Sequence, residues 1–363
     1  MRRRILIYGG TGYTGRLIAE HARDLRRAPV IAGRSADRVQ ALAARLGLPG
    51  RVIALDQPDA LDQALGDIAV VINAASPFAQ SAPALIEACL RTRTHYLDIT
   101  GELPVFRDAF GYDAAARKRG IMIMPGVGLG VVASDCLAKH VAARVPNAKY
   151  LRIALLRPDS FSRGSLRSAL GLTNSRVTIR QNGRLISVPV GRLQRAFDYG
   201  DGRRESVAVS WADVFTAYHS TGIRNIETYF EADFISRTLY QLGAGIAGTM
   251  RLPMVQRWVD LATRSWPEGP SPRQRRSEKC VLVAEAEDSW RRCSGARLET
   301  PDGYSFTAET ALAIGQRVAR GDFLPGFQTP ARVYGADFVL GFKGVRRVQI
   351  DGLFPPMHSD DMV

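Results

Sequence analysis

The first part of the chain alternates short apolar runs with longer amphipathic stretches. Apolar runs bounded by turn residues are typical of buried strands, whereas apolar residues that recur every three or four positions indicate helices. Strands are expected at residues 5–8, 29–32, 51–56, 69–75, 95–100 and 121–124, and helices at residues 17–22, 37–46, 61–65, 83–92 and 106–119. Strands that alternate with helices form a parallel sheet with right-handed crossovers and helices on both faces. The pattern therefore predicts a doubly wound α/β domain over residues 1–130.

The later part of the chain has a different pattern. Strand-like runs occur at residues 148–156, 184–190, 205–211, 226–232 and 279–288, and helical patterns at 163–172 and 308–320. Asn182-Gly183 and Gly200-Asp201-Gly202 are typical of hairpin turns. These signals predict a second α+β domain with a mixed sheet over residues 131–340, followed by a C-terminal tail, residues 341–363, that packs back on the first domain.

One segment of the second half, residues 235–266, is rich in Leu, Ile, Ala, Gly and Met but is interrupted by arginines. An amphipathic stretch of this kind either lies in a membrane interface or forms helices buried against the domain or a partner subunit. The sequence leaves both readings open.

Composition places the chain among intracellular globular proteins. It has 363 residues, of which 46% are hydrophobic, and it contains no apolar run long enough to cross a membrane. The four cysteines are scattered, so no disulfide framework is expected. We expect a cytoplasmic protein, with membrane contact only at its periphery through residues 235–266.

The net charge of +14 raises the question of a nucleic-acid partner. Lysines are rare among the 49 basic residues, and the arginines are spread along the chain without interleaved aromatic residues. A groove that binds single strands needs both a basic track and stacking aromatics. No nucleic-acid partner is therefore expected, and the densest basic cluster, residues 271–279, is expected to be a solvated loop.

A G-x-G-x-x-G motif, Gly10 to Gly15, lies between the first expected strand and the first expected helix. In that place one glycine makes a tight turn, the next admits a pyrophosphate and the last lets the helix pack closely on the strand. The free amides at the helix end then hold the phosphates. The expected dinucleotide-binding residues of this turn are Gly9, Gly10, Thr11, Gly12, Tyr13, Thr14 and Gly15.

The end of the second strand decides which nucleotide binds. Asp or Glu there would favour NAD, whereas Arg accommodates the 2′-phosphate of NADP. This chain has Gly33-Arg34-Ser35, so NADPH is expected rather than NADH, unless Arg34 is only a solvent-facing loop residue. Asp56 is expected beside the adenine, and Asn73-Ala74-Ala75 beneath the nicotinamide-side ribose; both could instead be ordinary strand-end residues.

The strings YGGTGYTG, AGRS, VVINAASPF and YLDITGE together resemble the saccharopine dehydrogenase-like oxidoreductases, which include trans-acting enoyl reductases. Residues 209–230, 301–312 and 325–340 are similar to segments of that family's second domain. The resemblance implies an N-terminal Rossmann domain that binds NADP. The chain departs from the family's G-F-D-x-x-P-S-D string at residues 128–135, where it lacks the Phe, the first Asp and the Pro; Ser134-Asp135 is still expected to begin a helix.

Hydride delivery also requires a proton donor. The loops at residues 76–78, 98–102 and 125–128 follow the fourth, fifth and sixth strands and are expected to line the reaction site. The candidate catalytic residues are His219, Tyr218 and Glu102. Glu102 could instead cap the helix that follows it, and Tyr218 and His219 could be a packed tyrosine and a loop histidine. The histidines lack the spacing of zinc ligands, so no metal site is expected.

Three hypotheses follow. The leading one is an NADPH-dependent reductase acting on a C=C, C=N or C=O bond of a small or lipid-like molecule, with residues 131–340 forming the substrate cavity and a homodimer face. The others are a regulator that senses NADP without chemistry and a protein that binds membrane surfaces.

Overall fold

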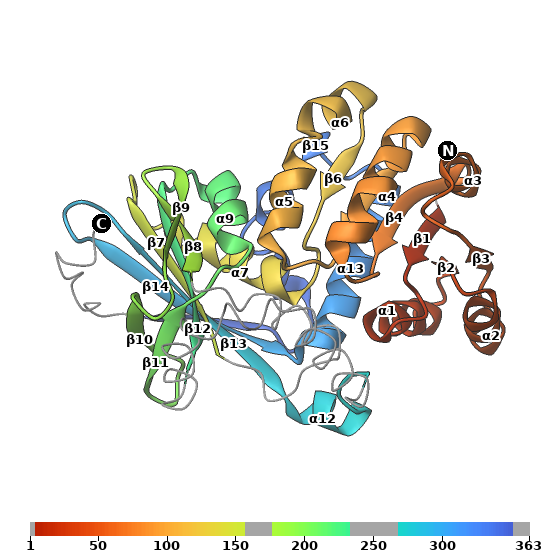
Figure 1. The fold of residues 1–363 in the computed structure, drawn as a ribbon. Coiled ribbons are helices and arrows are strands. Elements are labelled where there is room, and N and C mark those ends of the chain that lie inside the picture. Colours follow the sequence, from red (N-terminus) through yellow and green to blue (C-terminus); the bar gives the residue numbers. More distant parts are fainter. Residues whose placement is uncertain (1–3, 157–175, 233–267, 351–363) are drawn as a thin grey trace, which may run out of the picture. The chain divides into compact units, whose positions relative to one another are not determined.

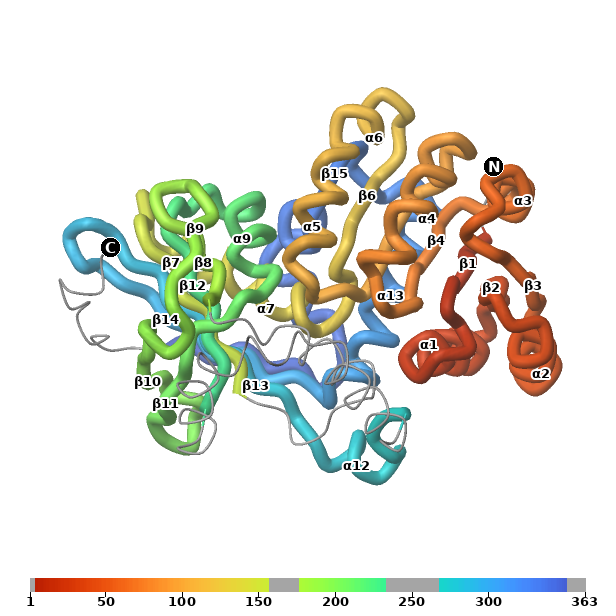
Figure 2. The backbone as a smooth tube through the Cα atoms, viewed as in Figure 1, coloured from red at the N-terminus to blue at the C-terminus, as the bar shows by residue number. Residues whose placement is uncertain are grey.

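The computed structural model describes residues 4–156, 176–232 and 268–350. Contacts divide the chain into two units, one made of Met1–Val132 and Asp302–Tyr334, the other of Ala133–Pro301 and Gly335–Val363. Figures 1 and 2 follow the chain through their elements. The helix expected at 163–172 and the apolar segment 235–266 lie outside the described residues.

The first unit contains a seven-stranded parallel sheet in the order β15-β6-β5-β4-β1-β2-β3. Its strands are β1 (Arg4–Tyr8), β2 (Val30–Gly33), β3 (Gly50–Val52), β4 (Ile68–Asn73), β5 (His95–Asp98), β6 (Met122–Met124) and β15 (Gly326–Phe327). Every pairing between neighbours is parallel. The strand order reverses between β1 and β4, and ligands bind beyond the carboxyl ends of the strands at such a switch point. The expected doubly wound α/β domain is confirmed.

Helices cover the sheet because its strands are apolar on both faces. All six residues of β4 are buried, as a central strand requires. The helices of this unit are α1 (Tyr13–Asp24), α2 (Ala36–Leu46), α3 (Pro58–Leu65), α4 (Phe78–Thr92), α5 (Leu103–Phe110), α6 (Asp113–Arg119), α13 (Gly303–Ala319) and α14 (Pro330–Tyr334). Helices α3 and α4 pack on β4, and α4 also packs on β5.

Helix α13 belongs to the first unit, whereas the sequence placed residues 302–334 in the second domain. It packs against α1 and against β1, β4 and β5. A Cβ atom on its Gly315 would lie 3.0 Å from Cδ1 of Ile72, so this glycine lets the helix approach the sheet closely. A segment far along the chain thus returns to cover part of the first sheet, and a pattern read within short windows of the sequence does not reveal such a long-range contact.

The second unit contains a mixed sheet, as expected. The main path is β10-β11-β12-β7-β13-β14-β16, and the hairpin β8–β9 joins at β12. Its strands are β7 (Tyr150–Leu155), β8 (Arg176–Gln181), β9 (Arg184–Pro189), β10 (Gln194–Asp198), β11 (Arg203–Ala208), β12 (Asn225–Glu231), β13 (Lys279–Glu287), β14 (Cys293–Pro301) and β16 (Arg346–Ile350). Among the described strands of this unit, only β7 and β12 pair in parallel, and the other pairs are antiparallel. Both predicted hairpin turns are confirmed, between β8 and β9 and between β10 and β11.

Three helices of this half correct the expectations. Helix α7 (Leu129–Ala142) begins at Leu129, so Ser134 and Asp135 lie inside it rather than at its start. His219, for which a place in a loop was one expectation, lies with Tyr218 in α9 (Asp213–Thr221), which ends at Gly222 with φ 76°. Helix α12 (Pro272–Ser277) replaces the solvated loop expected at 271–279, because a capping box at Ser271 stabilises it.

The C-terminal tail also differs from the expectation. Strand β16 pairs antiparallel with β14 of the second unit instead of packing on the first domain. The rest of the tail, residues 351–363, lies outside the described residues.

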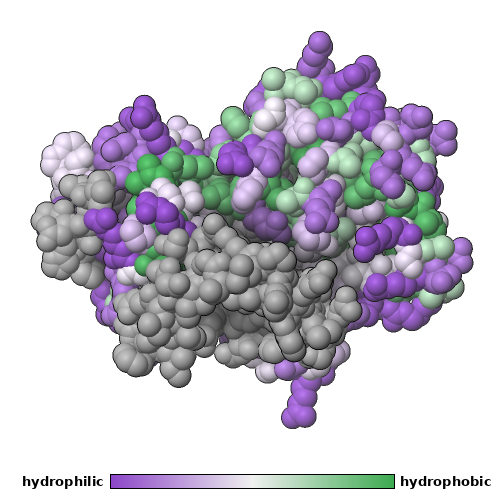
Figure 3. All heavy atoms as spheres, viewed as in Figure 1, coloured by the Kyte–Doolittle hydropathy of each residue, from purple (hydrophilic) through white to green (hydrophobic). Residues whose placement is uncertain are grey.

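Many arginines are neutralised locally. Arg91 contacts Asp62 at 2.7 Å, and Arg317 contacts Asp322 at the same distance. On the visible face of Figure 3, hydrophilic residues are interspersed with apolar ones rather than gathered in one continuous patch.

Candidate dinucleotide site and its surroundings

The glycine turn brings the end of β1 against the end of β4. Gly9 has φ 75°, a conformation that favours glycine, and the amide of Gly12 donates to its carbonyl oxygen at 2.9 Å. A Cβ atom on Gly9 would lie only 2.7 Å from the amide nitrogen of Ala75. The turn therefore sits at the switch point of the sheet, where the fold predicts a ligand.

The last two glycines of the motif differ in their surroundings. A Cβ atom on Gly15 would lie 2.8 Å from Cα of Gly10, so α1 packs directly on the turn. A Cβ atom on Gly12 would have only one close neighbour, the carbonyl oxygen of Gly9 at 3.3 Å. Gly15 is thus required for packing, whereas Gly12 keeps space open beside the helix start. This is the division of roles that the motif predicts.

The start of α1 is suited to an anion. Its N-cap is Gly12, which has no side chain to accept from the first amides, and its first turn contains no acidic residue. The first intrahelical bond is donated by Arg16 to Gly12, at 2.9 Å, so the preceding amides of the first turn have no acceptor in the helix. The amides of a helix's first turn and its positive end favour a diphosphate here. The residues fit the dinucleotide that the sequence predicts.

The side chain of Tyr13 contacts other side chains of the first unit and is not needed to bind a diphosphate. Its ring meets the ring of Tyr304 edge-on with centroids 5.2 Å apart, and the guanidinium of Arg16 lies 5.8 Å from its centroid. Tyr304 is in the first turn of α13. Tyr13 therefore offers its backbone to a ligand and its ring to the packing of α1 on α13.

The end of β2 carries the residues expected to select NADP. Gly33 ends the strand, and Ser35 is the N-cap of α2 without a side-chain cap hydrogen bond. Arg34 is exposed. Burial raises the pKa of the Tyr8 hydroxyl; the charge of Arg34 opposes this rise and that of Asp56 adds to it. Arg34 and Asp56 thus both act on the end of β1, although Asp56 lies in a turn beyond β3, which ends earlier than expected, at Val52.

The structure adds a second guanidinium that sequence reasoning missed. Nη2 of Arg38, in the first turns of α2, donates to the carbonyl oxygen of Thr11 at 3.0 Å. Arg38 follows Arg34 by four positions, which is the spacing of neighbours on one helix face. This spacing alone could not single out Arg38 in a chain with so many arginines.

The side chain of Asn73 is not available to the cofactor. It is fully buried and donates from Nδ2 to Ser81 and to Tyr96, while its Oδ1 accepts from the amide of Ala75 at 3.0 Å. Asn73 therefore fixes the conformation of the chain at the end of β4, and the backbone of Ala74 and Ala75 lies beside the glycine turn. Ala74 is fixed there because its amide donates to Tyr8 at 2.8 Å.

Glu102 is at the start of α5, as the helix-capping alternative predicted, but its side chain makes no cap hydrogen bond. Its amide donates to Oγ1 of Thr100 at 3.0 Å. Its position in the loop after β5 keeps it a candidate proton donor.

Tyr218 and His219 both lie on α9, in the second unit, whereas Glu102 and the glycine turn belong to the first. The ring of His219 lies 4.8 Å from that of Phe215. The guanidinium of Arg180 covers the ring of Tyr218 at 4.1 Å and donates to the carbonyl oxygens of Val214 and Gly183, both at 2.7 Å. Tyr218 is thus clamped to its helix by a buried arginine.

Two buried carboxylates, also missed by sequence reasoning, hold α9 against α7. Ser134 donates to Asp213 and Ser220 donates to Asp135, both at 2.5 Å. Burial, reinforced by the charge of Asp135, raises the pKa of Asp213 to about 8. Asp213 is therefore largely protonated at neutral pH.

Within the described residues, no three His, Cys, Asp or Glu side chains are grouped as metal ligands would be. In the same part of the chain, no helix combines the length and the apolar character needed to span a membrane.

Comparison with known proteins agrees with this geometry. Residues 5–124 match the family model of the saccharopine dehydrogenase NADP binding domain. Trans-acting enoyl reductases of Mycobacterium leprae and Mycobacterium ulcerans are 33% and 30% identical over 149 and 148 residues, which cover 39% of this chain in both cases. These alignments cover 36% and 35% of the relatives, so the chain spans about a third of their length.

The fold resemblance extends further than the sequence similarity. Saccharopine dehydrogenase (L-Glu forming) from Saccharomyces cerevisiae superposes with a TM-score of 0.61 at 15% identity, covering 96% of this chain and 100% of that one. Residues 5–124, which carry the glycine turn, Arg34 and Arg38, are thus similar to the NADP-binding domain of the saccharopine dehydrogenases.

Proposed function

We propose that the protein is an NADPH-dependent oxidoreductase that transfers hydride to a C=C, C=N or C=O bond of a small or lipid-like substrate. One observation carries the proposal. The space beside Gly12 and the first turn of α1 lie at the switch point of the sheet, with Arg34 and Arg38 just beyond the end of the adjoining strand. When bound, the reduced nicotinamide supplies the hydride. Every other contribution must come from the chain's own residues.

These residues divide the work in a definite way. The glycine turn binds the diphosphate, and Arg34 with Arg38 selects the phosphorylated ribose. The loops at 76–78, 98–102 and 125–128 follow β4, β5 and β6, so a hydride acceptor lies over them. The carbanion, amine or alkoxide formed needs a proton, for which Tyr218, His219 and Glu102 are the candidates.

Enoyl compounds are the first substrates to try, because the relatives matched over 39% of this chain are named trans-acting enoyl reductases. The alignments cover only about a third of those relatives, so they do not fix the substrate class. Imine and carbonyl compounds therefore belong in the same panel.

The test is consumption of NADPH, followed by its absorbance, with enoyl thioesters, imines and carbonyl compounds added in turn. The expected result is turnover with one class and a marked preference for NADPH over NADH. Tight binding of NADP by calorimetry together with no turnover for any class would favour the alternative, an NADP-sensing regulator. A homodimer stays a prediction, which light scattering at several protein concentrations would check.

A further inference from the structure

Three buried polar side chains connect the carboxyl ends of neighbouring strands in the first unit. Asn73 ends β4, Asp98 ends β5 and Tyr96 precedes Asp98 by two residues on the same strand. All three are fully buried. Buried polar groups at this density are costly unless every one is hydrogen-bonded, so the pattern of their bonds matters.

Asp98 holds the loops after β5 and β6 together. Its Oδ1 accepts from the amide of Thr100 at 3.0 Å and from the amide of Gly126 at 2.9 Å. Its main-chain oxygen accepts from Val127 at 2.7 Å. One residue thereby fixes two of the three loops on which a hydride acceptor would rest.

The same carboxylate reaches the third loop through Tyr96 and Asn73. The Tyr96 hydroxyl donates to Oδ2 of Asp98 at 2.9 Å and accepts from Nδ2 of Asn73 at 3.1 Å. Asn73 in turn binds Ser81, whose hydroxyl donates to the carbonyl oxygen of Ala75 at 2.7 Å. The chain of bonds therefore runs from the loop after β4 to the loop after β6.

The loop after β6 has little freedom to relax if these bonds are lost. A Cβ atom on Gly126, which has φ 74°, would lie 2.7 Å from Cζ of Phe106. Helix α13 holds the other side of the loop, because the Thr310 hydroxyl donates to Val127 at 2.8 Å and the Leu129 amide donates to Thr307 at 3.0 Å. A loop held on both sides adopts one position, and Asp98 supplies the bonds on the sheet side.

We propose that Asp98 is a positioning residue that sets where the three loops at the nicotinamide end of the sheet lie. This inference rests on the proposed function for its effect on turnover, but its effect on the loops does not. Asp98 is buried and acts through the amides it holds rather than by touching substrate. A carboxylate suits this position because its two oxygens only accept hydrogen bonds, and three donors point at it: the amides of Thr100 and Gly126 and the hydroxyl of Tyr96.

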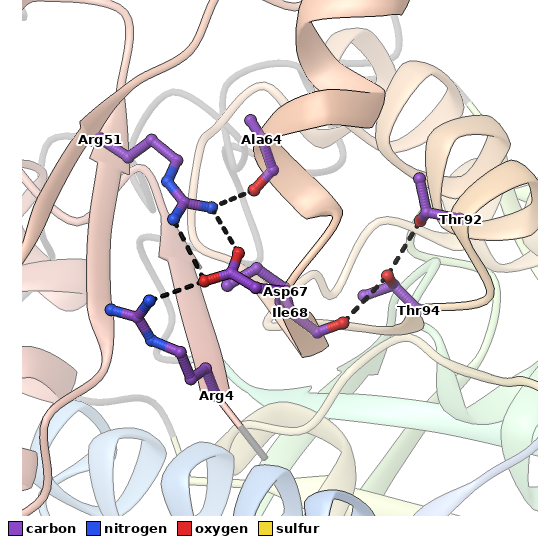
Figure 4. A network of polar contacts seen from close by, with 7 residues as sticks. All are labelled: Arg4, Arg51, Ala64, Asp67, Ile68, Thr92 and Thr94. Atoms are coloured by element: carbon purple, nitrogen blue, oxygen red, sulfur yellow. Dashed lines mark hydrogen bonds and ion pairs between the residues drawn. The ribbon is translucent and has the colours of Figure 1, made fainter. Parts of the chain in front are cut away.

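The test compares Asp98→Ala, which removes all side-chain acceptors, with Asp98→Asn, which keeps one oxygen for the amides of Thr100 and Gly126. The matched control is Asp67→Asn, at the amino end of β4. Figure 4 shows that Asp67 binds Arg4 and Arg51, at 2.6 and 2.9 Å, next to the amino end of β4 and so away from the loops that follow the carboxyl ends of the strands. Loss of these ion pairs leaves the loops untouched.

Two readouts do not depend on activity: hydrogen exchange at the amides of Thr100 and Gly126, and the fluorescence of bound NADPH. Asp98→Ala is expected to speed exchange at both amides and to change the emission, while the NADPH dissociation constant stays within about twofold because the phosphates bind elsewhere. Asp98→Asn should fall between Asp98→Ala and the wild type. If Asp98→Ala fails to fold, Asp98→Asn still has to show both changes.

With a substrate in hand, kcat is expected to fall about tenfold or more in Asp98→Ala, since small displacements of reacting groups are costly. Unchanged exchange and emission in both variants would overturn the inference, and so would loop changes with full turnover. If the wild type turns over no substrate, the proposed function fails, and the exchange and emission data alone decide for or against the role of Asp98.

Discussion

Nη2 of Arg38 donates to the carbonyl oxygen of Thr11 at 3.0 Å, and this bond joins the start of α2 to the glycine turn. Thr11 is also the residue whose hydroxyl would lie 3.8 Å from a Cβ atom on Gly33, so the end of β2 and the turn face each other. Arg34 follows Gly33 directly. In the proposed NADPH site, two arginines on one segment would face the 2′-phosphate, and the bond to Thr11 already holds Arg38 in place.

Arg34→Asp is expected to reverse the preference for NADPH, because a carboxylate repels the 2′-phosphate and accepts from a ribose 2′-hydroxyl. Each lost contact to the phosphate should cost about 1–3 kcal/mol. Arg38→Ala should weaken NADPH binding by a similar amount while leaving NADH unchanged. Calorimetric titration of both cofactors measures this.

The matched control for these variants is Arg45→Ala. Arg45 lies in the last turn of the same helix and pairs with Glu20 at 3.2 Å, away from the glycine turn. It should bind both cofactors as the wild type does. If Arg34→Asp and Arg45→Ala have the same affinities, Arg34 is not at the ribose.

Gly12 and Gly15 are expected to fail in different ways. Gly12→Val should fold, because a Cβ atom there meets only one backbone oxygen at 3.3 Å, but it should lose cofactor binding because the new side chain fills the space beside the helix start. Gly15→Ala should lower the free energy of unfolding, since its Cβ atom would overlap the backbone of Gly10. Urea unfolding and NADPH fluorescence together separate the two effects. Undiminished NADPH binding by Gly12→Val would contradict the assignment.

The sequence predicted the first sheet well because its signals are local. Six strands and the glycine turn each follow from residues within a short window. The seventh strand was not predicted, and the helix at 308–320 was placed in the second domain, because the contacts of both are with residues far away in sequence, such as Ile72 beside Gly315. Strand β15 has only two residues, too few for any pattern.

The residues of the candidate site were likewise predictable only where the signal is local. Gly12, Gly15 and Arg34 could be assigned because a motif gives each of them a role. Asp98 was named only as part of a loop, since nothing local indicates that amides from two loops converge on it. Asn73 was expected at the ribose because its position at a strand end is visible in the sequence, whereas its burial is not.

The proton donor can be assigned by three variants. Loss of the donor typically costs about a hundredfold or more in the chemical step. Tyr218→Phe keeps the ring under Arg180 and removes only the hydroxyl, so a fall in kcat with unchanged KM would identify Tyr218. His219→Ala and Glu102→Gln test the others in the same way. If all three keep their turnover number, the proton comes from water.

The pair Asp213 and Ser134 predicts a pH dependence of stability. The pKa of Asp213 is raised from 3.8 to about 8 by burial and by the charge of Asp135, while the hydrogen bond from Ser134 acts in the opposite direction. In the folded protein the group is therefore neutral up to about pH 8, whereas in the unfolded chain it ionises near pH 4. The unfolded state binds fewer protons between these values, so the contribution of Asp213 to stability is fully present below about pH 4. It falls as pH rises, by about 1.4 kcal/mol per pH unit, until about pH 8.

Asp213→Asn isolates this contribution, because the amide has the shape of the neutral acid and can accept from Ser134 but cannot ionise. The variant should match the wild type near pH 4 and become progressively more stable than it toward pH 8. Urea unfolding of both proteins at a series of pH values gives the difference directly. Ser134→Ala serves as a second comparison, since it removes the bond that lowers the pKa and should steepen the wild-type dependence near pH 8. Parallel curves for Asp213→Asn and the wild type across the whole range would mean that Asp213 is ionised in the folded protein, and the neutral Asp213 inferred between α7 and α9 would then be wrong.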